Sequence, residues 1–139
     1  MGEPVRVPSG ARSLYGKLLA IAPAFLTLSV GDVLCARPPA LELRVLGISG
    51  AFRRLELVRI ERDLSDELVP SPCVQMICDV ELQAACVVEY SDPYSHPASF
   101  VSRSSNVLQP PNRLVTALAG SLLDAEIGFG CMLAPRVGG

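Results

Sequence analysis

His96 is the residue best suited to acid–base chemistry in this sequence, because it is the only histidine of the chain. Asp92 and Ser95 lie close to it, so the residue types of a hydrolytic triad occur in one stretch. Such a set is found in almost any sequence, and no nucleophile-elbow motif accompanies it. The Gly-Phe-Gly of residues 128–130 does not complete a dinucleotide-binding fingerprint. The residues therefore favour a protein that is not an enzyme and needs no cofactor, with His96 as a polar loop residue.

Cysteine is the other reactive residue type, with five copies at positions 35, 73, 78, 86 and 131. An odd number fits poorly with the complete disulfide framework of a secreted domain. Cys73 and Cys78 are closely spaced, but the chain lacks the second close pair and the further histidines that a zinc site needs, so no metal site is expected. Cys86 and Cys131 are interpreted as buried free thiols.

Arginine dominates the positive charges, since Lys17 is the only lysine among 12 basic residues. The formal net charge of −2 gives no global basic field of the kind that drives nonspecific nucleic-acid binding. Arginine is the better ligand for phosphates and base edges, but a GC-rich genome produces the same excess. Any contact with nucleic acid must therefore be local.

The elements that would position these residues are clearest over residues 74–90, where apolar and polar residues alternate. Every even position is apolar or aromatic: Val74, Met76, Cys78, Val80, Leu82, Ala84, Cys86, Val88 and Tyr90. Period two predicts strand with one buried face and one largely solvated face, as in an antiparallel sheet. One straight strand would span roughly 55 Å, so a bend, a bulge or a tight turn is expected inside it.

Residues 40–49 and 53–62 flank Gly50 and predict a hairpin with a short loop. Within the second segment the apolar phase switches from Leu55 and Leu57 to Val58 and Ile60, which suggests a bulge or burial on both faces. Residues 63–72 are acidic and contain prolines, so we expect a loop there. Residues 97–104 are expected to add a short strand.

The composition changes after residue 110. Pro110-Pro111 suits the first turn of a helix, and Leu114, Leu118 and Leu122 then recur at spacings of four. These residues predict a C-terminal helix, with a second short helical turn around residues 127–133. The predicted fold is α+β, an antiparallel β-sheet followed by a C-terminal helix or helices.

Basic residues precede an apolar run at residues 18–30, which is the arrangement of a secretory signal peptide. Pro23 inside the run, Gly31-Asp32 after it and the retained Met1 favour a segment that stays in the mature protein. The run is shorter than the roughly 20 residues of a membrane-spanning helix, so no membrane contact is expected. Strands from Leu18 onward, turned at Pro23, are expected to form an N-terminal hairpin over residues 14–36.

The composition of the 139 residues, 50% hydrophobic and 19% charged, excludes a disordered chain and fits one domain over residues 1–139. A domain this small leaves a large share of its surface in water, so the apolar surplus is expected to meet another copy of the chain. Self-association is therefore the first functional prediction.

The order of these elements resembles the coat proteins of single-stranded RNA bacteriophages (leviviruses), small chains with an antiparallel sheet followed by C-terminal helices. Residues 39–45 resemble a strand of that family, and Tyr94-Ser95-His96 before residues 98–101 resembles another of its arrangements. Residues 114–127 resemble its Leu- and Ala-rich helical end, and Cys73 and Cys78 resemble a cysteine pair in a loop of some members. The resemblance covers about residues 39–139.

The resemblance implies a sheet completed across a homodimer, with helices that cross over the partner, and many dimers in an icosahedral shell around genomic single-stranded RNA. Such a virion would assemble in the cytoplasm of a bacterial host. The dimer interface would contain Leu114, Leu118, Leu122 and Ile127. Cys73 and Cys78 would form disulfides between neighbouring subunits or remain reduced.

In the coat family, RNA contacts lie on the sheet face away from the helices, where a genomic hairpin often binds. The candidates here are Arg44, Arg53, Arg54, Arg59 and Arg62. Arginines on adjacent strands can neutralise phosphates and stack on unpaired bases, and a solvated hairpin edge is the alternative. Asp79, Glu81 and Glu89 on the polar face of the long strand would repel phosphate, which argues against a strong hairpin site.

The competing prediction is an exported antiparallel β domain that binds a ligand after cleavage of its signal segment near Ala36. Some of Cys73, Cys78, Cys86 and Cys131 would then staple it. This prediction explains the N-terminal apolar run better and the C-terminal helix less well. The intact mass of the purified protein distinguishes the two, because export removes roughly 36 residues.

Overall fold

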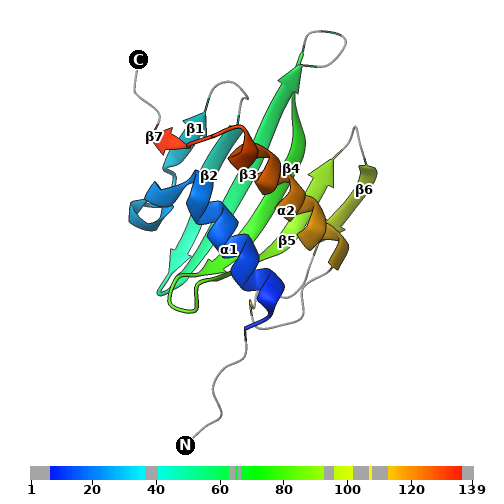
Figure 1. Ribbon diagram of the computed structural model, residues 1–139. Coiled ribbons are helices and arrows are strands. Elements are labelled where there is room, and N and C mark those ends of the chain that lie inside the picture. Colours follow the sequence, from blue (N-terminus) through cyan, green and yellow to red (C-terminus); the bar gives the residue numbers. More distant parts are fainter. Residues whose placement is uncertain are drawn as a thin grey trace, which may run out of the picture.

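The computed structural model describes residues 7–36, 41–62, 65, 67–92, 96–101, 107 and 113–135. The elements are α1 (Ser9–Ile21), the 3-10 helix η1 (Pro23–Thr27), β1 (Val33–Ala36), β2 (Leu41–Ser49), β3 (Phe52–Arg62), β4 (Leu68–Asp79), β5 (Ala84–Asp92), β6 (His96–Val101), α2 (Arg113–Gly128) and β7 (Ala134–Pro135). Figure 1 shows the two helices lying across a twisted sheet. The α+β class with antiparallel strands and a C-terminal helix is confirmed.

The sheet is antiparallel throughout, in the order β6-β5-β4-β3-β2-β1-β7. The predicted hairpin is confirmed as β2 and β3, which pair from Leu41↔Arg59 to Ser49↔Phe52. Gly50 in its turn has a φ of 57°, a left-handed conformation that glycine adopts without a steric penalty. The predicted irregularity of β3 is a register shift against β4 between Val58 and Ile60.

The N-terminal segment is helical, so the predicted hairpin over residues 14–36 is wrong. The buried residues of α1 are Ala11, Leu14, Tyr15, Leu18 and Ile21. They recur at the three- and four-residue spacings of one helix face, and this stripe packs on the sheet. Pro23 lies in the first turn of η1, where its missing N–H is not needed. Within this region only β1 is a strand.

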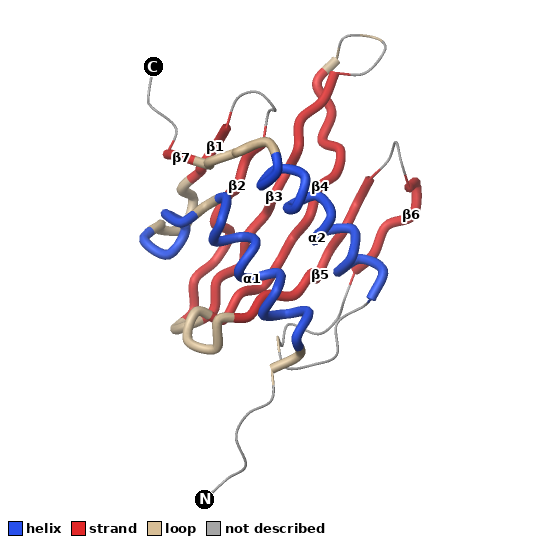
Figure 2. Tube along the Cα trace, viewed as in Figure 1, coloured by secondary structure: helices blue, strands red, loops and turns tan. Residues whose placement is uncertain are grey.

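Both helices cover the same face of the sheet, as Figure 2 shows. The core lies between this face, called the helix face below, and the two helices. Its largest fully buried side chains are Phe25, Leu14, Leu18, Ile21, Leu34, Leu41, Leu43, Leu55, Leu57, Met76, Leu123 and Leu133. Five of these residues precede Ala36, so cleavage there would remove a large part of the core.

The alternating run of residues 74–90 is divided between β4 and β5, which confirms the expected turn inside it. Asp79 stabilises this turn because its Oδ1 accepts hydrogen bonds from the N–H groups of Glu81 and Leu82, both at 3.0 Å. The predicted loop over residues 63–72 is too long, because β4 already begins at Leu68. Cross-strand pairing with β3 from Arg62↔Leu68 onward outweighs the local proline signals.

The predicted C-terminal helix is confirmed as α2, whereas residues 110–112 lie outside the described residues. The second helical turn expected at residues 127–133 is wrong. The chain leaves the helix at Gly130, whose φ of 71° is left-handed, and continues to β7. None of the helices in the described part of the chain is long and apolar enough to span a membrane.

Candidate functional site

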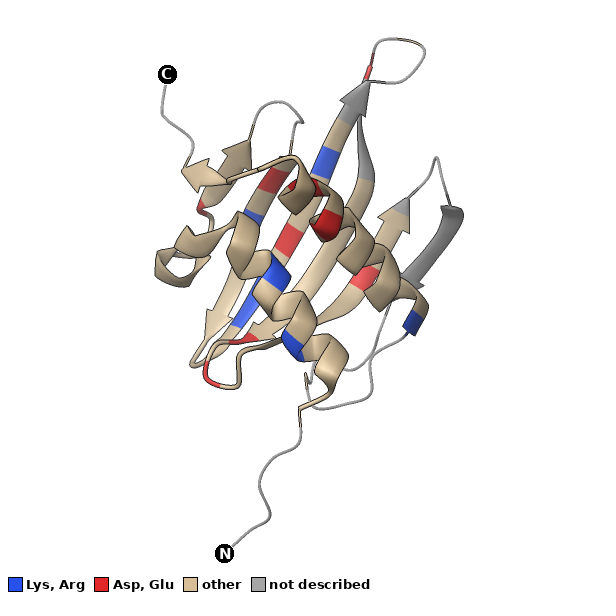
Figure 3. Cartoon of the chain, viewed as in Figure 1, with Lys and Arg blue, Asp and Glu red and all other residues tan. Residues whose placement is uncertain are grey.

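The sheet face opposite the helices, called the open face below, carries a row of polar side chains across four strands. The row is set by register, because Arg44 pairs with Glu56, Glu56 with Gln75, and Gln75 with Glu89. Their neighbours along the strands are buried on the helix face, so alternation directs this row away from the core. Figure 3 shows acidic and basic residues interspersed along the strands.

A hydrogen-bond network stiffens the open face. Arg54 donates from Nη2 and Nε to Gln75 Oε1, at 2.9 and 3.2 Å, and Gln75 Nε2 donates to Glu56 Oε2 at 3.3 Å. The amide of Gln75 on β4 thus links the guanidinium of Arg54 to the carboxylate of Glu56, both on β3. The two bonds hold the Arg54 guanidinium through its Nε and Nη2. Its Nη1 makes no hydrogen bond to Gln75 or Glu56.

The five candidate arginines do not gather on one face. Arg44 and Arg54 are exposed on the open face. Arg53 bends over the hairpin turn, where its Nη1 donates to Gly50 O at 2.7 Å, and Arg59 lies on the helix face. Only the backbone of Arg62 is described, at the end of β3. The structure therefore places two of the five on the open face.

Arg59 forms a buried ion pair that the sequence analysis missed. Its Nη2 lies 3.0 Å from Oε1 of Glu126, whose side chain is 1% exposed on α2. Glu126 Oε2 is buried and has no hydrogen-bond partner among the described residues. Burial and then the negative charge of Glu126 raise the pKa of the nearby Cys131 thiol. The sequence signal was a glutamate placed on the apolar stripe of the helix, four residues after Leu122.

Cys73 and Cys78 both lie in β4, so their expected position in a loop is wrong. The alternation of the strand directs Cys73 to the open face and Cys78 to the core, where Cys78 is fully buried. Burial is the first cause of a raised pKa for both thiols. An inter-subunit disulfide through Cys78 would need the core to open.

The Cys73 thiol is held protonated by its neighbours on the open face. Burial, the charges of Glu56 and Glu89, and a hydrogen bond to Glu56 together raise its pKa to about 11. Since the thiolate is the nucleophile, Cys73 should react slowly with iodoacetamide at pH 8 and faster as the pH rises toward 11. We expect Glu56→Gln to lower this pKa and to speed alkylation at pH 8.5 by about three- to tenfold. Peptide mass spectrometry measures the rate, and Glu81→Gln in the exposed β4–β5 turn is the matched control.

The four predicted interface residues of α2 do not share one surface. Leu122 is buried in the chain's own core and Leu118 packs against that core. Leu114 and Ile127 are exposed near opposite ends of the helix. In the single chain Leu122 and Leu118 attach α2 to its own sheet, and Leu114 and Ile127 are the two that stay exposed; the interface itself stays a prediction.

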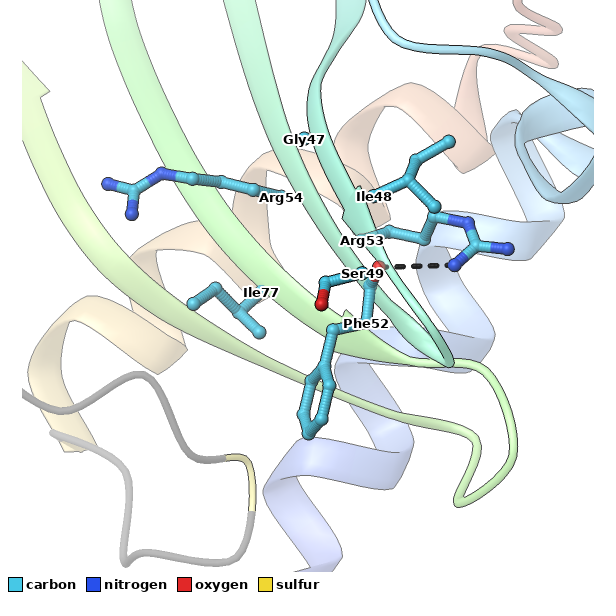
Figure 4. Close-up of a pocket in the computed structure, with 7 residues that line it drawn as sticks. All are labelled: Gly47, Ile48, Ser49, Phe52, Arg53, Arg54 and Ile77. Atoms are coloured by element: carbon cyan, nitrogen blue, oxygen red, sulfur yellow. Dashed lines mark hydrogen bonds between the residues drawn. The ribbon is translucent and has the colours of Figure 1, made fainter.

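One pocket of about 360 Å³ lies on the open face beside the β2–β3 turn. Its lining residues are Gly47, Ile48, Ser49, Phe52, Arg53, Arg54 and Ile77. Figure 4 shows Phe52 and Ile77 next to each other, with Arg54 and Arg53 extending to opposite sides. The lining contains three apolar side chains and two cations but no carboxylate. Ile77 is only 7% exposed, because it belongs with Cys86 and Val107 to a small second core that covers part of the open face over β4 and β5.

No constellation typical of catalysis was found in the part of the chain that the structure describes. No group of three or more histidine, cysteine, aspartate and glutamate side chains there could hold a metal ion. His96 was expected in a loop, but it is the first residue of β6, paired with Asp92, and its side chain lies outside the described side chains. Comparisons of the chain with family models, with curated proteins and with solved structures found no match in any of the three.

Proposed function

We propose that this chain is a structural protein that associates with copies of itself, in the form of a coat subunit whose dimers build a shell around single-stranded RNA. The proposal rests on the difference between the two faces of the sheet. Two helices cover one face of the sheet, and the other face over β2 to β4 presents fixed charged side chains to solvent. The phage coat proteins that the sequence resembles have a comparable division between a helix side and an RNA side.

The dimer contact that we propose is the outer edge of β6. β6 is the last strand on its side of the sheet and pairs only with β5 among the described strands. An edge strand presents N–H and C=O groups that another chain can pair with. An antiparallel β6–β6 contact about a two-fold axis would complete one sheet across the homodimer.

The chain differs in two ways from the coat family that its sequence resembles. α1 occupies the place of the expected N-terminal hairpin, and α2 packs on its own sheet rather than on a partner. The helices are therefore not part of the proposed dimer contact. The apolar side chains that remain exposed outside the core would form the contacts between copies.

RNA would contact the open face through Arg44 and Arg54. Arg54 is held in place by Gln75, so little side-chain freedom is lost when its guanidinium meets a phosphate. Glu56 and Glu89 lie in the same row and weaken the attraction. The expected interaction is therefore packaging of RNA without strong sequence preference.

The test is the size and content of the purified full chain. Light scattering and negative-stain microscopy should show uniform hollow particles, and hydrogen exchange should show that the amides of β6 become protected on association. The ratio of absorbance at 260 and 280 nm reports packaged host RNA. A chain that stays monomeric at millimolar concentration would contradict the proposal.

Replacing Arg44 and Arg54 together with alanine should reduce the RNA in the particles roughly twofold or more, because two phosphate contacts are lost at each copy of the site. The particles themselves should persist. The matched control is the pair Arg12→Ala and Arg113→Ala, which removes the same charge from exposed positions on the helices. Equal RNA content in both double variants would show that the open face does not bind RNA.

A further inference from the structure

The loop after α2 carries the most exposed aromatic side chain among the described residues. Phe129 is 78% exposed and Met132 is 58% exposed. We call this pair the knob. Large apolar side chains placed together in water are a sign of a contact surface.

The knob is held rigidly at both ends. Gly130 N–H donates to Ile127 O at 3.0 Å and Cys131 N–H donates to Glu126 O at 2.9 Å, which is the hydrogen-bond pattern of a Schellman helix end. One residue beyond Met132, Leu133 is buried in the core and its N–H donates to Ile21 O at 2.7 Å. These bonds hold the backbone of the loop in one conformation, in which the side chains of Phe129 and Met132 stand exposed.

The pocket beside the β2–β3 turn is the complementary surface, and we call its open-face apolar residues Phe52 and Ile77 the socket. Ile48 pairs with Arg53 and lies at the rim of the pocket. An apolar cavity of about 150 Å³ is enough to bind benzene. The pocket that contains the socket has about 360 Å³ and opens to solvent, so it has room for the ring of Phe129 with the side chain of Met132 beside it.

Charge and position agree with this pairing. The knob follows the C-terminal end of α2, the negative end of the helix dipole, and no basic residue lies in the last turn of that helix. The socket is flanked by Arg53 and Arg54. The end of α2 and the β2–β3 turn lie at opposite ends of the sheet in Figure 1, so one chain cannot close the contact on itself.

We infer that the knob of one copy enters the socket of the next, a head-to-tail contact that links the proposed dimers into larger assemblies. A heterologous contact of this kind closes into rings or continues without end, whereas a two-fold contact stops at a dimer. The inference rests on the proposed self-association and adds the second type of contact that a shell needs.

The test uses one variant on each side of the contact. Phe129→Ser and Phe52→Ser should each weaken the assembly of the full chain beyond the dimer about tenfold or more, because buried aromatic anchors dominate such contacts. Val30→Ser, an exposed apolar residue outside both surfaces, is the matched control and should assemble like the parent chain. Ile48→Ser, at the rim of the same pocket, is a second variant if Phe52→Ser lowers the melting temperature.

Mixing the two variants gives the decisive result. Each retains the half that the other has lost, so light scattering of an equimolar mixture should show association that neither variant shows alone. If the β6 dimer exists, the mixture should form large assemblies; if the β6 proposal fails, it should stop at a one-to-one pair. Unchanged assembly of the single variants, or a mixture without added association, would overturn the inference. The inference would also be overturned if Phe52→Ser changed the binding of a small apolar dye to the pocket but left assembly unchanged.

Discussion

A variant with Arg59→Leu should unfold with a free energy about 3 kcal/mol lower than the parent chain, because it leaves the Glu126 carboxylate in the core without its cation. The carboxylate side chain is 1% exposed, and its second oxygen has no hydrogen-bond partner among the described residues. Arg59 keeps about a quarter of its own side chain in water, so we expect the low end of the range for a broken buried pair. Urea unfolding followed by circular dichroism measures the change.

The double variant Arg59→Leu with Glu126→Leu makes this prediction specific. It removes both charges, and replacing a buried pair by apolar side chains is often close to neutral. Its stability should therefore return to within about 1 kcal/mol of the parent chain, far from the sum of the two single changes. Arg44→Leu on the exposed open face is the control and should change stability by about 0.5 kcal/mol at most. Additive losses would show that the two residues do not act as a pair.

A shortened chain that begins after Ala36 should not fold at all. The deletion removes α1, η1 and β1, which supply Leu14, Leu18, Ile21, Phe25 and Leu34 to the core. Truncating one such side chain costs about 2–5 kcal/mol, and a whole domain is stable by only about 5–15 kcal/mol. We expect no cooperative thermal transition and no near-ultraviolet circular dichroism signal.

Single substitutions give the matched comparison for this deletion. Leu18→Ala should fold but lose about 3 kcal/mol, whereas Val30→Ala at an exposed position should change little. A cooperative transition in the shortened chain would instead favour the exported domain, because that alternative requires the remainder to be stable without its first segment.

The strands were predictable because they have an exposed face. Polar residues such as Gln75 and Glu89 interrupt the apolar run every second position, so the period is visible without any tertiary information. α1 was mistaken because its apolar residues join those of η1 into one continuous run. The helix spacing from Ala11 to Ile21 was present in the sequence, but Thr27, Val30 and the prolines added competing strand and turn signals.

The candidate site was only partly predictable. Strand parity already separates Arg54 from Arg53 and Arg59, since the latter two share the face of Leu55 and Leu57. The partner of Arg59 was not accessible in this way, because Glu126 is distant in sequence and the crossing of α2 over the sheet decides which residue meets it. The pocket at the β2–β3 turn likewise depends on how Ile77 of β4 lies beside Phe52, which no local pattern contains.

The packing of α1 also determines when the chain can complete its fold during synthesis. α1 leaves the ribosome before β5 and α2, the elements that cover its apolar stripe, and most of the sheet is translated in between. Until then Leu14, Leu18 and Ile21 lack their cover, so the apolar stripe of α1 is open to aggregation during that interval.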